Sequence, residues 1–253
     1  QERVLVIDIR HQFGRKYFGG RHVIHCLIQR RQNRRCAGLN LSGGMGMDAY
    51  FFSKHANHVD YVELNSELAS ITEKNFKLLG AEHILVHQKD SAQFLSGTDQ
   101  HFDLIYIDPD RRVKKERAFR IDECEPNVGE LLPQIWSKSK QCLIKLSPML
   151  DISQALEELT NCKEVHIVSV DNECKELLFL LEKDFSDEPT VQCVNIKKEC
   201  IQHFSFSMSE ERSAIPQFSR PLNFLYEPNA SILKAGGFKR VATFFGLSKL
   251  ETN

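Results

Sequence analysis

Apolar runs alternate with stretches of helical periodicity between residue 36 and about residue 183. Glycine and polar turn residues bound the runs, which is typical of strands. They predict strands at 36–41, 59–64, 83–88, 102–107, 141–146 and 164–170. The intervening periodicity predicts helices at 47–56, from the N-cap Asn65 or Ser66 to Gly80, and after Pro148. This alternation favours an α/β domain with a mainly parallel sheet and helices on both faces.

The pattern changes towards the C terminus. The run "CKELLFLLE" (174–182) follows strand 164–170 and predicts either its antiparallel partner, as a terminal antiparallel strand, or a helix. The segments "VQCVNIKK" and "QHFSFSMS" alternate apolar and polar residues, so they predict a further hairpin. A linker with Pro216 and Pro221 follows, and then two short helices are expected around Gly236 and Gly237. The chain thus divides into a basic N-terminal segment (1–35), a main domain (36–215) and a small C-terminal α-containing appendage (216–253).

The composition is that of a soluble globular protein. Of the 253 residues 42% are apolar and 26% charged, and no apolar run approaches the roughly 20 residues that span a bilayer. The start, "QERVLVIDIR", lacks the order of a signal peptide. The eight cysteines include no C-x-x-C pair, so free thiols in a reducing cytoplasm are expected, without a zinc site.

Charge is distributed unevenly along the chain. Residues 1–35 carry nine Lys or Arg against two acids, whereas the remainder carries 24 basic and 32 acidic side chains. The stretch "RRQNRR" (30–35) could hold a phosphate backbone, and it could equally be a solvated terminus.

Polar residues follow four of the predicted strands. Ligands of open parallel sheets bind outside the carboxyl ends of the strands, and those ends carry 42–48, Glu63, Asp90 and 108–112. Glycines allow the backbone to approach a ligand, and an acid after the second strand can accept hydrogen bonds from two ribose hydroxyls. The four clusters therefore predict one site for a nucleotide-like cofactor.

The glycines also fit a second interpretation. Gly44-x-Gly46-x-x-Ala49, followed by Glu63, matches the dinucleotide fingerprint of an NAD-dependent dehydrogenase. Against it, the sequence shows no clear catalytic His, Tyr or Lys set, and Asp108-Pro109-Asp110 is left without a role.

Four motifs carry a family resemblance. "LNLSGGMGMDAYFFS", "YVELNSEL", "HQKDSAQFL" and "FDLIYIDPDRR" resemble, in order and spacing, the motifs of class I S-adenosylmethionine-dependent methyltransferases, which have a Rossmann-like fold. The resemblance covers about 36–183. "LYEPNASILKAGGF" (225–238) resembles a segment of a bacterial methyltransferase group whose accessory domain is likened to the RNA-binding THUMP module. Residues 216–253 are accordingly expected to belong to a truncated accessory domain.

The resemblance implies a role for each cluster. The backbone at Ser42, Gly43, Gly44 and Gly46 would pass under the methionine part of S-adenosyl-L-methionine. Glu63 would bind the ribose, and Asp90 and Ser91 would lie beside the adenine. Asn40 stands where the family usually has an acid near the cofactor's ammonium group, so it loses charge assistance there.

The turn Asp108-Pro109-Asp110 is expected at the boundary of cofactor and substrate. It resembles the Asp-Pro-Pro and Asn-Pro-Pro turns with which nitrogen methyltransferases hold a planar base. Pro109 fixes φ, so the carbonyl of Asp108 points in one direction. Methyl transfer is an in-line displacement that depends on such alignment.

Three further residues are candidates for the substrate side. Arg111 and Arg112 suit a substrate phosphate, or form a surface ion-pair cluster with Asp110. Ser147 lines the acceptor pocket, or is part of a plain helix-entry turn. The sequence predicts a methyltransferase acting on a nitrogen of RNA (tRNA or rRNA). A catalytically silent nucleic-acid-binding protein stays open, because Asn40 and residues 1–35 depart from the family pattern.

Overall fold

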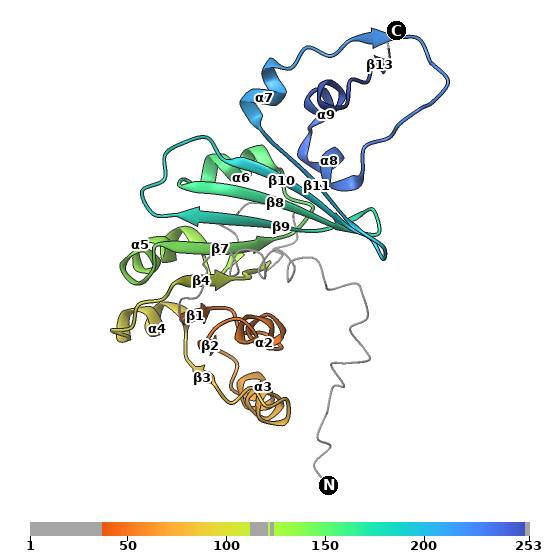
Figure 1. The fold of residues 1–253 in the computed structure, drawn as a ribbon. Helices are drawn as coiled ribbons and strands as arrows, with labels where there is room; N and C mark the ends of the chain where they lie inside the picture. The colour runs from red at the N-terminus through yellow and green to blue at the C-terminus, as the bar shows by residue number, and fades with distance from the viewer. Residues whose placement is uncertain (1–36, 112–120, 122–123, 251–253) are drawn as a thin grey trace.

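The computed structural model describes residues 37–111, 121 and 124–250. Within them a nine-stranded twisted sheet runs through the molecule, with helices on both of its faces (Figure 1). The strand order is β11-β10-β8-β9-β7-β4-β1-β2-β3. This is the mainly parallel sheet that the alternating pattern predicts, in the Rossmann-like arrangement that the family resemblance implies.

Five parallel strands form one half of the sheet. They are β1 (Ala37–Asn40), β2 (His58–Glu63), β3 (Ile84–Gln88), β4 (Leu104–Ile107) and β7 (Gln141–Leu146). β1 lies between β2 and β4 and is parallel to both, so the strand order reverses beside β1. The loops after β1 and β4 diverge from this switch point, where open α/β sheets bind their ligands.

The other half of the sheet mixes directions. It contains β8 (Cys162–Val170), β9 (Glu173–Glu182), β10 (Thr190–Ile196) and β11 (Ile201–Ser207). β9 is antiparallel to both β7 and β8, which settles the open choice for 174–182 in favour of a strand. β10 and β11 form the predicted hairpin, and β10 joins the sheet parallel to β8.

Two apolar clusters attach the helices to opposite faces. On one face lie α2 (Met47–Ser53) and α3 (Ser66–Leu78), which bury Phe52 and Phe76 against the sheet. On the other lie α4 (Ser91–Gly97), α5 (Val128–Lys138), α6 (Ile152–Glu158) and α8 (Ala230–Ala235), whose apolar residues belong to the larger cluster. Burial of these side chains removes apolar area from water and is the main force that holds the layers together.

Helix starts follow their capping residues. Asn65 accepts from the Leu68 N–H at the start of α3, Asp90 caps α4 and Asn127 caps α5. Such caps satisfy N–H groups that have no partner within the helix. The start of α3 was readable from the sequence for this reason.

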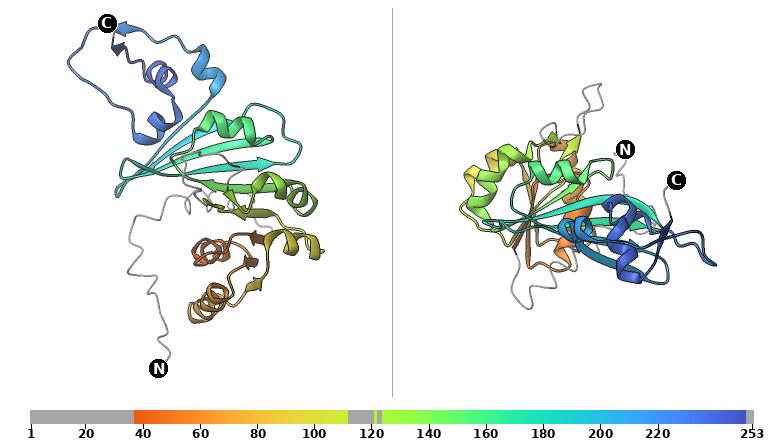
Figure 2. Two further views of the ribbon diagram at one scale, coloured as in Figure 1. Left: turned by 180° about the vertical axis from the view of Figure 1, so that it is seen from behind. Right: turned by 90° about the horizontal axis from the view of Figure 1, so that it is seen from above.

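The C-terminal segment extends from the β11 end of the sheet, away from β1–β3 (Figure 2). It contains α7 (Met208–Ser213), β12 (Phe218–Ser219), α8, α9 (Phe238–Phe245) and β13 (Lys249–Leu250). α8 and α9 are the two predicted helices, and they are separated at Gly236 and Gly237. β12 and β13 form a separate two-stranded parallel pair.

One predicted strand is too long. The alternation of "QHFSFSMS" predicts a strand to residue 209, but β11 ends at Ser207 and α7 begins at Met208. Ser207 and Glu210 form a capping box, in which each side chain binds the other residue's backbone N–H. This local hydrogen bonding ends the strand.

The cysteines and the helices of the described part of the chain bear on two of the sequence predictions. Its cysteines (Cys124, Cys142, Cys162, Cys174, Cys193 and Cys200) are free thiols, as predicted for the whole set. None of its helices is long and apolar enough to span a membrane. The predicted basic segment 1–35 lies outside the described residues.

Candidate cofactor and acceptor site

The loop that follows β1 depends on two glycines at close approaches. A Cβ on Gly43 would lie 2.3 Å from the ring of Tyr61, closer than real Cβ contacts allow. A Cβ on Gly46 would lie 2.4 Å from the methyl group of Thr72, and the φ of Gly46 is 73°. Gly43 is therefore required for packing, and Gly46 for both packing and its left-handed conformation, independently of any ligand.

Glu63, at the end of β2, binds this loop directly. Its Oε2 accepts from the N–H of Gly44 at 2.8 Å, and its Oε1 accepts from the N–H of Asn65 at 2.8 Å. The carbonyl of Gly44 accepts a 2.6 Å hydrogen bond from the hydroxyl of Tyr61. Burial raises the pKa of that hydroxyl, so it stays a donor. The glycine loop and the acid after β2 thus meet, as the sequence predicts for one cofactor site.

The start of α4 joins the same group. The hydroxyl of Ser91 is buried and donates to the carbonyl of Leu41 at 2.6 Å. Asp90 Oδ1 accepts from the N–H groups of Ala92 and Gln93. Asp90 thus caps α4, and its place beside an adenine stays a prediction.

Asn40 and Ser42 connect β1 to β4. The buried side chain of Asn40 accepts from the N–H of Ser42 at 3.1 Å, so its amide oxygen shapes the loop. The hydroxyl of Ser42 accepts from the N–H of Asp108 at 2.6 Å. The two strand exits at the switch point are therefore linked by a side chain.

Asp108 belongs to a charged group that sequence reasoning missed. Lys145, near the end of β7, forms an ion pair with Asp108 and another, at 3.2 Å, with Asp48 of α2. The hydroxyl of Tyr106 donates to Asp48 at 2.9 Å. A lysine inside the apolar strand "QCLIKL" was the available signal, because a charge in a buried strand needs a partner.

The electrostatics of this group follow from partial burial. Burial raises the pKa of the Asp108 carboxyl, whereas the ammonium group of Lys145 opposes that rise. Burial acts to lower the pKa of Lys145, but Asp48 and Asp108 raise it above its ordinary value. Lys145 is therefore an ammonium ion at neutral pH.

The rest of the predicted acceptor side lies around this group. Pro109 is buried, and Asp110 is exposed in the short strand β5 (Asp110–Arg111), which pairs with β6 (Cys124–Glu125). The hydroxyl of Ser147 accepts from the N–H of Met149 and closes the turn before α6. The side chains of Arg111 and Arg112 lie outside the described residues.

Two histidines of the described chain, His58 and His87, take part in a hydrogen-bonded group around Asp60. His58 and His87 both bind the buried carboxylate of Asp60, at 2.8 and 2.5 Å. Among the residues that the structure describes, no group of three His, Cys, Asp or Glu side chains could hold a metal ion.

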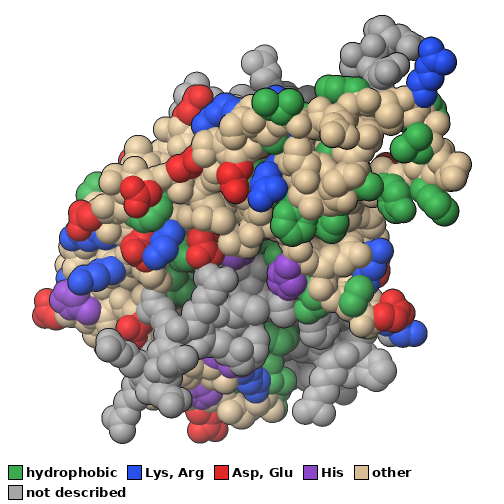
Figure 3. Space-filling model, turned by 45° about the horizontal axis from the view of Figure 1, so that its top comes forward, with side chains coloured by type: hydrophobic (Ala, Val, Ile, Leu, Met, Phe, Trp, Pro, Cys, Tyr) green, Lys and Arg blue, Asp and Glu red, His purple; other side chains and the backbone are tan. Residues whose placement is uncertain are grey.

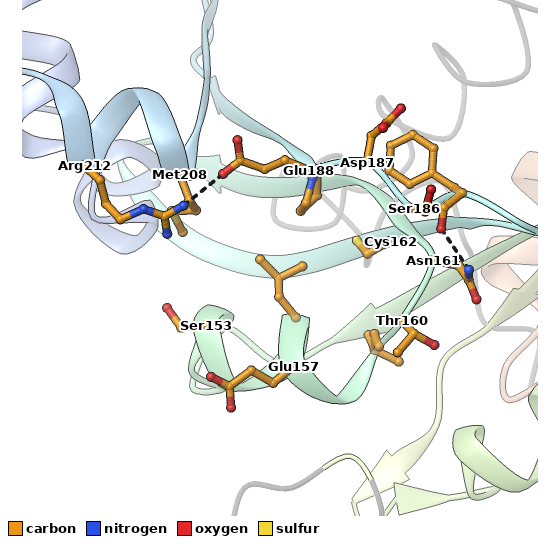
Figure 4. Close-up of a pocket in the computed structure, with 14 residues that line it drawn as sticks. Ser153, Glu157, Thr160, Asn161, Cys162, Ser186, Asp187, Glu188, Met208 and Arg212 are labelled. Atoms are coloured by element: carbon orange, nitrogen blue, oxygen red, sulfur yellow. Dashed lines mark hydrogen bonds and ion pairs between the residues drawn. The ribbon is translucent and has the colours of Figure 1, made fainter.

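A shallow pocket lies at the opposite edge of the sheet (Figure 4). It is lined by residues around the amino ends of β8 and β10, among them Asn161, Asp187, Glu188 and Arg212. Glu188 accepts from Ser209, and these hydrogen bonds and Arg212 lower the pKa of its carboxyl. Because the pocket is remote from the carboxyl ends of β1, β2 and β4, it is no part of the cofactor site.

Comparisons with known proteins agree with this geometry. Residues 32–120 match the family described as Conserved hypothetical protein 95, and residues 224–253 match a ferredoxin-like domain. A structure described as a putative methyltransferase from Porphyromonas gingivalis W83 is 32% identical, with a TM-score of 0.77. The match covers 90% of this chain and 58% of that one. No curated protein sequence matches the chain.

Other solved structures are more distant. An rRNA methylase from Streptococcus thermophilus is 13% identical over 64% of this chain and 95% of its own, with a TM-score of 0.47. A putative methyltransferase from Streptococcus mutans, in complex with SAH, is 10% identical over 64% and 96%, also with a TM-score of 0.47. These scores are too low to bear on function.

The sheet order, the motifs at the strand ends and the Porphyromonas gingivalis relative show that the chain belongs to the class I methyltransferases. The chain spans 58% of the length of that relative. The predicted likeness of the C-terminal segment to a THUMP module has no match among these proteins and stays a prediction.

Proposed function

We propose that this protein is an S-adenosyl-L-methionine-dependent methyltransferase that methylates a nitrogen of RNA, either tRNA or rRNA. The observation that carries the proposal is the convergence of three chain segments on the loop after β1. Glu63 binds Gly44, Ser91 binds Leu41, and Asp108 binds Ser42. Residues at or just after the ends of β2, β3 and β4 thus contact the glycine loop that follows β1, although they are far apart in the sequence.

The donor set fits the proposed cofactor. S-adenosyl-L-methionine, when bound, supplies an electrophilic methyl group on a positively charged sulfur. Glu63 offers carboxylate oxygens to ribose hydroxyls, and the loop at Ser42–Gly46 offers backbone groups to the amino-acid part. Asp90 and Ser91 stand at the start of α4 for the adenine.

Asp108 is the residue proposed to face the acceptor. It stands at the carboxyl end of β4, beside the cofactor loop to which Ser42 ties it. An ionised carboxylate there can accept an N–H of the acceptor, aim the nitrogen lone pair and stabilise the positive charge that develops. Pro109 and Asp110 would complete the turn, with Ser147 on the β7 side.

The RNA half of the proposal has separate support. The basic residues 1–35 and the pair Arg111 and Arg112 suit a phosphate backbone. Residues 214–250 carry five basic side chains against the single acid Glu227. The same segment exposes aromatic rings, including Phe224, Tyr226 and Phe244, and hydrophobic side chains are visible beside Lys and Arg towards this end of the molecule (Figure 3). Exposed rings among basic groups suit single-stranded RNA.

Two measurements test the proposal. Calorimetric titration with S-adenosyl-L-methionine should show binding, and labelled methyl groups should be incorporated into total RNA. Asp108→Ala should retain cofactor binding and lose incorporation. If the folded protein gave no heat of binding with ligand up to about 1 mM, its affinity would be negligible, and S-adenosyl-L-methionine would be excluded as the cofactor.

The alternative functions have their own tests. If the protein were an NAD-dependent dehydrogenase, mixing it with NADH should enhance the fluorescence of NADH. Under the proposed function we expect no change in that fluorescence. Asn40, which replaces the family's usual acid, is the reason for considering a catalytically silent nucleic-acid-binding protein. Such a protein should bind RNA but show no affinity for the cofactor. Methyl incorporation would exclude it.

A further inference from the structure

Lys145 is an unusual residue for its position. It lies in β7, whose neighbours Ile144 and Leu146 are buried, and its side chain is only 24% exposed. Its ammonium group contacts Asp108 and lies 3.2 Å from Asp48. Packing alone does not account for a lysine in such a strand, since an apolar residue is often at least as stable in a largely buried position.

Acids outnumber bases around Lys145. Asp48 faces it from α2, Asp108 from the position after β4, and Glu176 from β9. The hydroxyl of Tyr106, on β4, donates to Asp48, and Asp110 adds negative charge near Asp108. Within the part of the chain that the structure describes, Lys145 is the one cation in this set.

This arrangement matters for the state of Asp108. The carboxyl is partly buried and lies near Asp48 and Asp110, and each of these conditions favours its protonated form. A protonated carboxyl is a weaker hydrogen-bond acceptor and carries no charge to balance the positive charge on an acceptor nitrogen. Lys145 is the group that opposes protonation.

We propose that Lys145 is a positioning residue, which keeps Asp108 ionised and holds one of its carboxylate oxygens so that the other faces the methyl acceptor. This role rests on the proposed methyltransferase function. The contact is made to Oδ2 of Asp108, which leaves Oδ1 for the acceptor. Lys145 is not the base, because its acidic neighbours keep it protonated.

The first test compares variants of Lys145 by the pH dependence of kcat/KM for methyl transfer to RNA. Lys145→Met removes the charge at similar length, so the acidic limb should move to higher pH. The loss should be roughly 10-fold or more at about pH 6 and smaller at about pH 8.5. Lys145→Arg keeps the positive charge, so the acidic limb of its pH profile should stay that of the wild type. The matched control is Lys163→Met, because Lys163 is also paired, with Glu182 on β9, but lies away from the site.

The second test changes Asp48, and it should shift the acidic limb of the pH profile in the opposite direction. Asp48→Asn removes an acid that disfavours ionised Asp108, and it leaves Lys145 to Asp108 alone. The acidic limb should therefore move to lower pH. This variant retains the lysine, so it tests the same idea if Lys145→Met fails to fold.

A readout without turnover separates this inference from the proposed function. The carboxyl carbon of Asp108, assigned through Asp108→Asn in protein labelled with ¹³C-aspartate, is titrated by NMR. Its pKa should rise in Lys145→Met and fall in Asp48→Asn. Absence of methyl transfer in the wild type would refute the proposed function. If Lys145→Met lost activity equally at every pH and left the titration of Asp108 unchanged, the proposed role of Lys145 would be refuted.

Discussion

Ser42 and Asp108, 66 residues apart, are joined by a 2.6 Å hydrogen bond from the backbone N–H of Asp108 to the hydroxyl of Ser42. The bond crosses the point where the strand order reverses, between the exits of β1 and β4. It therefore fixes the cofactor loop relative to the residue proposed to face the acceptor. The effect of removing it can be measured separately on binding and on folding.

Ser42→Ala should weaken binding of S-adenosyl-L-methionine roughly 5- to 10-fold, because the N–H of Asp108 loses its partner and the two loops are no longer tied. Calorimetry measures the affinity. Ser96→Ala is the matched control, since Ser96 makes only a local bond to the carbonyl of Gln93 at the exposed end of α4. Equal effects of the two changes would show that the bond has no special role.

Gly43→Ala should destabilise the fold by about 2 kcal/mol or more, because the added methyl group overlaps the ring of Tyr61 and a tightly packed site relaxes only partly. Urea unfolding measures the free energy. Gly97→Ala makes the same chemical change where nothing lies within 4 Å of the new Cβ, so it should be nearly neutral. A neutral Gly43→Ala would mean that Tyr61 moves freely.

The sequence was informative where the signal is local. Strand ends, glycine turns and helix caps such as Asn65 depend on neighbouring residues, so the parallel strands and the edge at which their ends meet could be predicted. The position of β9 between β7 and β8 could not be predicted, because its pairing with β7 depends on backbone that is distant in the sequence. The same limit applies to Lys145, whose acidic partners Asp48 and Asp108 come from other elements. The sequence shows the charge of each of these residues, but it does not show that they lie close together in the fold.

Glu63→Gln should weaken cofactor binding about 10-fold or more. Glu63 already accepts from the N–H groups of Gly44 and Asn65, and hydrogen bonds to a charged acceptor are the stronger kind. The neutral amide replaces one acceptor oxygen by a donor. Glu67→Gln, an exposed change in the first turn of α3, should leave the calorimetric affinity unchanged. A loss of affinity in both variants would point to general charge, not to the ribose contact.

Asp108→Asn should reveal the stability cost of ionising Asp108. Burial raises the pKa of this carboxyl in the folded state, so folding favours its protonated form. Stability from the protonated group is present below the unfolded pKa of about 4 and is lost as pH rises through the higher folded pKa. The wild type should therefore lose stability relative to Asp108→Asn across that window. Urea unfolding of both proteins at a series of pH values measures the difference, and a difference that moved the other way would contradict the raised pKa.

Phe224→Ala combined with Tyr226→Ala should weaken binding of single-stranded RNA roughly 30-fold or more, because base stacking contributes about 1–3 kcal/mol for each ring. The two rings are exposed, with centroids 6.4 Å apart, so their loss should not alter the fold. Fluorescence anisotropy over a range of salt concentrations is the measurement. The salt dependence should stay that of the wild type, because no charge is removed. Ile215→Ala is the control, as an equally exposed apolar residue of the same segment without a ring. If all variants bound RNA like the wild type, these rings would not contact RNA, and the apolar surface of residues 214–250 would have another role.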